Sequence, residues 1–438
     1  MKKKKIIIII LCVILFVCGG LFTAFKLFFD PYRGTVSDGE WKLTSALDEV
    51  LTKNQAVSEI DFILQRLKER HPACIDEIPQ PVLEQARIEK ENIPEQVTVL
   101  QLWQMSSRIL AKMNDAHTSV EVLLEQGNYL PISFRFDKER LYVTNGEFNG
   151  CEVTHIGGIS TDELYRTFLS QFSYELEEYA STHFSNLCQS NNYLAFLNID
   201  VSGSVQIDFE TPDGKASQEF KFFGLEEFEF ERDDTPFVSY EIDKEQDVGI
   251  FILNECTFDE TYRQTLEAFF KEIKDNQISN VIVDLRDNGG GSSNVINEFV
   301  RYLDIDEYFA YGGEDGRYGS ILWKNKAIKT TNSKMQDLLF KGDVYVLTSS
   351  LTFSAAMNFA VTISDNGLGQ IVGEICGGMP SAYGDVLHFQ TPITKMALNI
   401  PFKYFYRVDR SKSDEPLIPD EMVSAFEALD KVYEMINQ

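Results

Sequence analysis

Two short segments in the last 200 residues contain residue types that suit covalent catalysis. The first, residues 287–291, reads Asp-Asn-Gly-Gly-Gly and directly follows the apolar run Val281–Val283 and Asp284-Leu285-Arg286. Consecutive glycines let the backbone adopt conformations closed to other residues and bring bare N–H groups close to an anion or a carbonyl oxygen. An oxyanion site needs such a loop. A tight turn with a purely geometric role would have the same sequence, so this loop alone leaves both interpretations open.

The second segment is a serine turn at the end of another apolar strand. Val344–Leu347 predicts the strand, Thr348 ends it, and Ser354 directly precedes a helix-like segment that begins at Ala355. A serine at a helix N-terminus lies in the field of the helix dipole, beside free backbone N–H groups that can hold a developing oxyanion. Helix capping is the alternative, because serine is a common N-cap residue.

One of the five histidines stands out by its surroundings. His117 lies in the phrase Asp115-Ala116-His117-Thr118, where a predicted helix gives way to a β-like segment. A histidine at such a junction is either an ordinary hydrogen-bonding residue or a general base, since its unperturbed pKa is about 6.5. We interpret the others as structural residues: His71, His155, His183 and His388.

The elements that position these segments alternate between strand and helix. We expect strands at 249–255, 280–286, 343–349 and 370–375, and helices at 262–276, 294–304 and 354–365. This alternation predicts a mixed α/β sheet, in which binding sites form at the carboxyl ends of strands. The glycine loop and the serine turn both follow predicted strands, so they converge on one edge of the sheet.

The chain ahead of this domain has two different patterns. Apolar positions at helical spacing between residues 44 and 113 predict a helical region, whereas short runs of period two between 130 and 223 predict a β-rich module with a helical insertion at about 162–197. We therefore divide the chain into four parts: 1–29, 30–128, 129–245 and 246–438.

The N-terminus predicts a membrane anchor. Four lysines follow Met1, and Ile6 to Phe25 is an uncharged apolar run long enough to span a bilayer as a helix. The lysines place the N-terminus in the cytoplasm and the rest of the chain outside, in a bacterial cell membrane with a single pass. Because no Ala-x-Ala type site follows the run, an uncleaved anchor is favoured over a cleaved signal peptide.

Charge and cysteine content exclude several classes of protein. The net charge of −28 opposes binding to nucleic acid or anionic lipid. The seven cysteines include no Cys-x-x-Cys pair and accompany no paired histidine ligands, so neither a zinc site nor a disulfide framework is indicated. We expect no metal and no cofactor.

The motifs together resemble a known family. VIVDLRDNGGG, then VYVLTSSLTFSAAMNF, then IVGEICGG are similar to the catalytic domain of the C-terminal processing (tail-specific) serine peptidases, which include the tricorn core protease and the interphotoreceptor retinoid-binding proteins. The likeness covers about residues 246–438 and extends to the phrase MNDAHTSV. It implies a crotonase/ClpP-like mixed sheet for the catalytic domain. CEVTHIGGISTDELY resembles half of a PDZ domain, which implies a degenerate, substrate-handling module at 129–245.

The resemblance also implies roles for single residues. Ser354 becomes the nucleophile, and the N–H groups of Ala355 and Gly290 become the oxyanion hole. In Ser–Lys members a lysine follows the Gly-Glu strand, but Met379 stands there in this chain. The tricorn-like branch instead uses a histidine from the N-terminal part, a role that His117 fits.

An acid that orients the histidine is the least determined member of the implied site. Tricorn-like members carry a glutamate shortly before a terminal Pro-Asp phrase, and Glu415 occupies that neighbourhood without matching its spacing. Glu374 lies on the correct sheet edge and is the second candidate, although it is shared with Ser–Lys members.

The resulting hypothesis is a membrane-anchored extracytoplasmic serine endopeptidase that cleaves proteins or peptides through an acyl-enzyme. One alternative is a catalytically silent relative that binds peptides or a small apolar ligand in the same cleft. Another is an acyl-CoA-type enzyme on a related scaffold, which would not need a serine–histidine pair.

Overall fold

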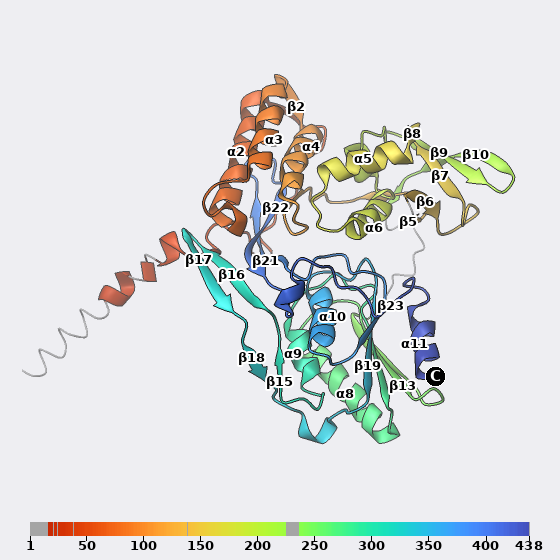
Figure 1. The fold of residues 1–438 in the computed structure, drawn as a ribbon. Coiled ribbons are helices and arrows are strands. Elements are labelled where there is room, and N and C mark those ends of the chain that lie inside the picture. The colour runs from red at the N-terminus through yellow and green to blue at the C-terminus, as the bar shows by residue number, and fades with distance from the viewer. Residues whose placement is uncertain are drawn as a thin grey trace, which may run out of the picture.

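The structure, a computed structural model, describes residues 16–20, 22–23, 25–37, 39–137, 139–224 and 236–437. Figure 1 shows a helical region and a β-rich module side by side above a larger α/β domain. Most of the predicted anchor lies outside the described residues, which begin at residue 16. No helix in the described part of the chain is long and apolar enough to cross a bilayer.

The helical region begins two of its helices with the same capping device. Thr52 and Thr98 accept hydrogen bonds from the N–H groups of Gln55 and Gln101, whose side chains accept from the two threonine N–H groups. These capping boxes satisfy orphan donors at the helix starts. The elements here are β1 (Val50–Thr52), α2 (Lys53–Arg70), α3 (Gln80–Asn92), β2 (Gln96–Thr98), α4 (Val99–Leu110) and β3 (Ser119–Glu121).

The β-rich module is one antiparallel sheet covered by helices. Its strands run in the order β10-β9-β7-β6-β5, with β8 paired to β7. The strands and helices are β4 (Asn128–Tyr129), β5 (Phe134–Asp137), β6 (Arg140–Val143), β7 (Glu152–Ile156), β8 (Ile159–Ser160), α5 (Thr161–Gln171), α6 (Glu177–Leu187), α7 (Asn191–Phe196), β9 (Ser204–Thr211), β10 (Gly214–Lys221) and β11 (Phe223–Gly224). The three helices occupy the predicted insertion, while a PDZ-like role for the module stays a prediction.

The α/β domain is built on the sheet β12-β13-β14-β19-β20-β23, in which only β12 runs antiparallel to its neighbour. Its first elements are β12 (Val238–Asp243), β13 (Val248–Leu253), α8 (Glu260–Asn276), β14 (Asn280–Asp284) and α9 (Asn294–Val300). The later ones are β19 (Asp343–Thr348), α10 (Ala355–Asp365), β20 (Gln370–Gly373), β23 (Glu421–Met422) and α11 (Ala428–Ile436). The mixed α/β class and its strand–helix order agree with the sequence prediction.

A second sheet joins the α/β domain to the helical region. Its order is β17-β16-β22-β21, and β3 of the helical region pairs with β22. The strands of this sheet and the small pair beside it are β15 (Glu307–Phe309), β16 (Gly313–Tyr318), β17 (Ile321–Lys326), β18 (Lys329–Thr331), β21 (Ala382–Gln390) and β22 (Ala397–Phe405). In Figure 1 the β21–β22 hairpin rises from the α/β domain into the helical region.

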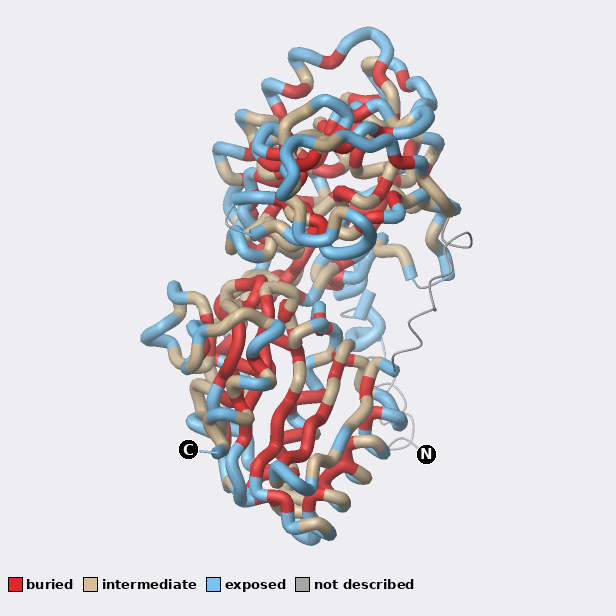
Figure 2. The backbone as a smooth tube through the Cα atoms, turned by 90° about the vertical axis from the view of Figure 1, so that its right-hand side faces the viewer, coloured by how far each residue is buried: buried red, intermediate tan, exposed pale blue. Residues whose placement is uncertain are grey.

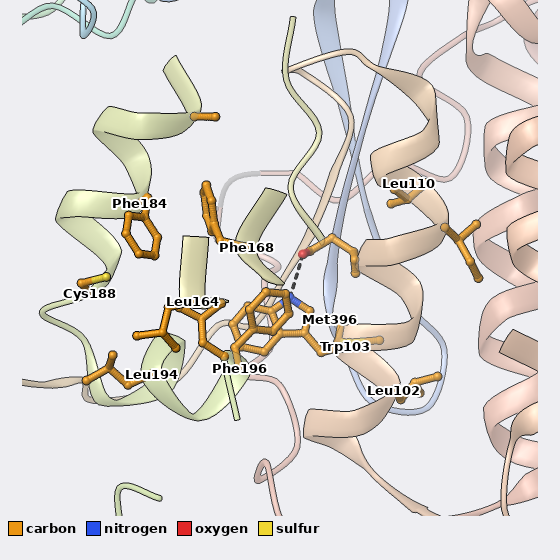
Figure 3. Close-up of a cluster of buried hydrophobic side chains, with 14 of the residues drawn as sticks. Leu102, Trp103, Leu110, Leu164, Phe168, Phe184, Cys188, Leu194, Phe196 and Met396 are labelled. Carbon is orange, nitrogen blue, oxygen red and sulfur yellow. Dashed lines mark hydrogen bonds between the residues drawn. The ribbon is translucent and has the colours of Figure 1, made fainter. Parts of the chain in front are cut away.

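The hydrophobic core follows this arrangement. Trp103, which is 1% exposed, packs against Phe196 and donates its indole N–H to the Val120 carbonyl at 2.9 Å. Figure 3 shows this indole beside Phe168 and Met396, the latter from the β21–β22 turn. Figure 2 shows that buried residues line the inside of both the upper and lower parts of the molecule. The last quarter of the sequence therefore shares a core with the first.

A buried ion pair fixes the far end of α10. Arg407 donates from Nη2 and Nε to the two carboxylate oxygens of Asp365, at 2.9 and 3.0 Å, and the two side chains are 4% and 0% exposed. Asp365 also accepts the Asp409 N–H at 2.9 Å. The segment that follows β22 is thereby attached to the helix that begins at Ser354.

We predict that Arg407→Met lowers the free energy of unfolding by about 3–5 kcal/mol, because it leaves the Asp365 carboxylate buried without its counter-charge. Urea unfolding of a fragment that begins at Asp30 measures the loss in the free energy of unfolding. The double variant Arg407→Met/Asp365→Leu should recover part of it, since no unpaired charge remains. A single variant as stable as the wild type would contradict a structural role for this pair.

Candidate active site

Ser354 occupies a strained turn between β19 and α10. Its backbone angles are φ 51° and ψ −121°, a region that non-glycine residues rarely enter. Such strain persists only where the surrounding structure over-determines it, and a nucleophile on a sharp strand-to-helix turn is one such place. The loop before it is held by Thr352, whose hydroxyl accepts the Ser349 N–H at 2.9 Å and donates to the Leu285 carbonyl at 2.8 Å.

The glycine loop packs directly against this serine. A Cβ added to Gly290, which has φ of 112°, would lie 2.8 Å from the Ser354 Cβ and 3.2 Å from the Ala355 nitrogen. Only glycine fits this contact. Asn288 organises the loop, because its buried side chain accepts the Gly290 N–H at 2.9 Å and donates to the Leu253 carbonyl at 2.8 Å.

The donors that face the cavity differ in part from the sequence expectation. The Ala355 N–H, one of the two donors expected from the sequence, donates no hydrogen bond among the described residues. The Gly290 N–H is instead committed to Asn288, and Gly290 is buried. The next residue, Gly291, lines the same cavity as Ser354 and Ala355, and its N–H donates no bond within the part of the chain that is described.

His117 belongs to the helical region, and its side chain reaches Ser354 of the α/β domain. Its Nε2 lies 3.2 Å from Ser354 Oγ, which is within hydrogen-bond range. The imidazole stacks on Phe353 with ring centroids 4.7 Å apart, and Phe353 stacks in turn on Tyr179 at 4.4 Å. Aromatic packing therefore holds the imidazole plane beside Ser354.

Asp115 shapes the loop that carries this histidine. Its carboxylate accepts the His117 N–H at 3.0 Å, the Thr118 hydroxyl at 2.5 Å and a hydrogen bond from His71 Nε2 at 3.2 Å. His71 Nδ1 accepts the Ala73 N–H at 3.1 Å, so the hydrogen of the neutral His71 ring lies on Nε2. His71 thus has a structural role: it donates to Asp115, which holds the loop that carries His117.

The protonation state of His117 suits a general base. Burial lowers the pKa of His117 below its ordinary value, and the nearby charges of Asp115 and Asp385 only partly oppose this shift. The imidazole is therefore largely neutral near pH 7, which is the charge state that a general base needs.

A lysine lines the same cavity but is not available as a base. Lys403 forms ion pairs with Asp385 at 2.8 Å and Glu314 at 3.3 Å. Burial lowers the pKa of Lys403, but the two carboxylates outweigh this effect and raise the pKa above its ordinary value. Lys403 thus stays charged, and Lys395 lies half-buried in the β21–β22 turn, where its Nζ donates to the Pro392 carbonyl.

The two acids proposed from sequence lie away from the histidine. Glu374 accepts the N–H groups of Ala425 at 2.9 Å and Ser350 at 3.3 Å. Glu415 is exposed, and its described hydrogen bonds run through its backbone. Neither side chain forms a hydrogen bond or ion pair with His117 among the described residues: the Glu374 carboxylate bonds to backbone N–H groups, and Glu415 is exposed.

A different glutamate lies beside His117. Glu175, just ahead of α6, accepts the Met379 N–H at 3.0 Å. Oxygens of Asp115 and Glu175 and a ring nitrogen of His117 lie within 4.8 Å of one another. The sequence carries no spacing signal for this contact, because Glu175 belongs to the insertion of the β-rich module.

The Asp115–His117–Glu175 cluster has donor types that also bind divalent metals. Its present contacts favour a hydrogen-bonded acid–histidine group, because Asp115 already has three donors and His117 Nε2 faces Ser354. The adjoining cavity of about 780 Å³ is lined by Ser354, His117 and apolar side chains that include Ile296, Met357 and Val361.

Comparisons with known proteins identify a family and similar folds. Residues 248–420 match the model of peptidase family S41. The structure of mature CPAF complexed with lactacystin superposes with a TM-score of 0.67 at 12% identity, over 88% of this chain and 97% of that one. Mature CPAF gives 0.66 at 12% identity, over 88% and 96%. The photosystem II D1 C-terminal processing protease gives 0.48 at 11% identity, over 89% and 98%.

No curated protein matches the chain by sequence. At these identities the superpositions show a shared fold only. Residues 248–420 belong to peptidase family S41, and the protein is a serine-type peptidase, a hydrolase. The family and the enzyme class expected from the sequence are confirmed.

We predict that Ser354→Gly makes the protein about 1 kcal/mol more stable than Ser354→Ala, because only glycine adopts these backbone angles without strain from a Cβ atom. Both variants lack the hydroxyl, so the difference in their stability reports the backbone strain at residue 354. Thermal unfolding of the two proteins provides the measurement. Equal unfolding temperatures would mean that the turn stores no strain.

Proposed function

We propose that this protein is an endopeptidase in which Ser354 is the nucleophile and His117 the general base. The observation that carries the proposal is the 3.2 Å contact between Ser354 Oγ and His117 Nε2 at a strained strand-to-helix turn. Met379 at the position of the family's lysine, and the ion pairs of Lys403, support a histidine base of the tricorn-like kind.

The reaction begins with attack on a substrate carbonyl. Ser354 Oγ forms a bond to the carbonyl carbon while its proton passes to His117 Nε2. The carbonyl oxygen becomes an oxyanion, held by the Ala355 N–H and by a second donor of the glycine loop. Gly291 is the better choice for this donor, since Asn288 occupies the Gly290 N–H. The helix dipole of α10 favours the same negative charge.

The intermediate then collapses to products. The C–N bond breaks, the leaving amine takes the proton from His117, and an acyl-enzyme remains on Ser354. Water adds to the acyl group while His117 accepts a proton, and return of that proton to Ser354 Oγ releases the carboxylic acid. The family implies a protein or peptide as substrate.

We predict that Ser354→Ala abolishes hydrolysis of unfolded casein by the soluble fragment from Asp30, and that His117→Asn lowers kcat by roughly 10⁴-fold, in line with loss of a triad member. Lys395→Ala, in the β21–β22 turn, is the control and should keep wild-type activity. Rates of fluorescent casein release measure all four proteins.

The results separate the remaining alternatives. A wild type that binds casein without cleaving it would indicate a silent binder. Hydrolysis that persists in Ser354→Ala would end the assignment of the nucleophile, and a greater loss in Lys395→Ala than in His117→Asn would end that of the base.

The apolar run from Ile6 to Phe25 supports the further proposal that the enzyme is anchored in the cell membrane with its catalytic domain outside. This run and the preceding lysines have the length and charge bias of a single-pass anchor.

We predict that the full chain stays in the membrane pellet after carbonate extraction of a bacterial host, whereas a chain that begins at Asp30 is released. Protease added to intact spheroplasts should digest the full chain. N-terminal sequencing that finds a start between residues 20 and 30 would instead indicate a cleaved signal peptide.

A further inference from the structure

One ring nitrogen of His117, the base of the proposed mechanism, has no hydrogen-bond partner among the described residues. When His117 Nε2 accepts the Ser354 proton, the other ring nitrogen, Nδ1, must carry a hydrogen. Buried Nδ1–H groups need an acceptor, because an unpaired buried donor is costly. In the structure Nδ1 is buried and makes no hydrogen bond with any described residue.

Asp115 is the nearest carboxylate in sequence, but its oxygens are already used. Its Oδ1 lies 3.9 Å from His117 Nδ1, which is too far for a direct hydrogen bond. That same oxygen accepts the His117 backbone N–H, and Oδ2 accepts from Thr118 and His71. Asp115 therefore holds the loop and is a poor direct partner for the ring.

Glu175 offers an acceptor that lacks a donor. Its Oε2 accepts the Met379 N–H, whereas its Oε1 is buried and has no hydrogen-bond partner in the described chain. An oxygen of Glu175, an oxygen of Asp115 and a nitrogen of His117 lie within 4.8 Å of one another. A point between three such atoms is about 2.8 Å from each, which is the length of one hydrogen bond to water. Three polar partners are also what a buried water requires.

We propose that Glu175 is the positioning acid of the active site, which accepts the His117 Nδ1 hydrogen through one bridging water. The proposal rests on the Ser354–His117 mechanism above. Glu175 then fixes the tautomer in which Nε2 is the base and stabilises the imidazolium that forms during attack. No other acid of the described chain joins Asp115 and His117 in such a cluster.

Protonation of Glu175 would switch this role off. As a carboxylic acid it donates to the bridging water, which in turn donates to Nδ1 and leaves the ring hydrogen on Nε2, the wrong tautomer for a base. As a carboxylate it accepts from the water, and the water accepts from Nδ1–H. The groups that face it are Asp115, His117, Tyr179 and Tyr404, together with the N–H groups of Ala116 and Met379. Burial, and next the charge of Asp115, raise the pKa of Glu175 to about 8.

We predict that kcat/KM rises with pH through about 8, as the Glu175–His117 pair loses the proton that blocks the base. Glu175→Gln should lower kcat by roughly 100-fold or more, within the range of general acid–base effects, with little change in KM, and should remove this limb of the profile. Glu175→Asp, which keeps the charge, should recover part of the rate. Glu178→Gln, an exposed change in α6, is the matched control and should behave as wild type.

A loss of activity in Glu175→Gln is not expected to come from a loss of stability. A glutamate whose pKa is raised in the folded state stabilises the protein below its unfolded pKa of about 4.5 and loses that contribution as pH rises through 8. Glutamine cannot ionise, so Glu175→Gln should unfold at the wild-type temperature or higher at pH 9. Glu175→Gln with wild-type kcat and the same pH profile would overturn the proposal.

A measurement without catalysis separates this inference from the proposed function. In the Ser354→Ala background, ¹⁵N NMR of the His117 ring reports which nitrogen carries the hydrogen. We expect Nδ1–H at pH 9, with a shift to Nε2–H when Glu175→Gln is added. An unchanged tautomer would assign the role to Asp115 and reject Glu175. If instead the tautomer shifts but the wild type cleaves no protein, the peptidase assignment fails while the contact stands.

Discussion

The pairing of β3 with β22 is the contact on which the active site depends. Val120 of β3 lies opposite Leu398 of β22, and Asn399 donates its side-chain amide to Ser119 Oγ at 2.9 Å. The indole of Trp103 adds a hydrogen bond to the Val120 carbonyl. His117 is only two residues ahead of this strand, so the pairing determines where the base lies. Because β22 belongs to the same domain as Ser354, a short antiparallel ladder brings Ser354 and His117 together across 237 residues of sequence.

The serine side of the site relies on a second set of contacts at the sheet edge. Asn288 accepts the Gly290 N–H, and the Asn288 carbonyl accepts the Phe353 N–H at 3.1 Å. Thr352 bonds to the Leu285 carbonyl on the same edge. These hydrogen bonds thereby connect the carboxyl ends of β14 and β19. This network over-determines the turn, which explains how Ser354 keeps its unfavourable backbone angles in the absence of substrate.

The sequence predicts those features that depend on local pattern. Alternating strands and helices, the serine turn and the glycine loop all follow from periodicity and turn residues, and His117 follows from a short family motif. Features that depend on tertiary contact could not be read in this way. The Asn288 side chain accepts the Gly290 N–H, which is therefore not available to a substrate. The sequence does not show this, because the adjacent glycines look equivalent. Glu175 lies in an insertion whose helical pattern says nothing about which face meets the catalytic domain.

The two carboxylates beside His117 show how one site assigns different roles to similar groups. Burial would raise the pKa of Asp115, but the hydrogen bond from His71 and the other interactions around it lower the pKa below its ordinary value. Asp115 is therefore a fixed negative charge. That charge adds to the cost of ionising the nearby, largely buried Glu175, because like charges at this separation oppose each other in a medium of low dielectric. The same aspartate that orders the histidine loop thus keeps its neighbour near the point of titration, where a small change in surroundings decides the tautomer of the base.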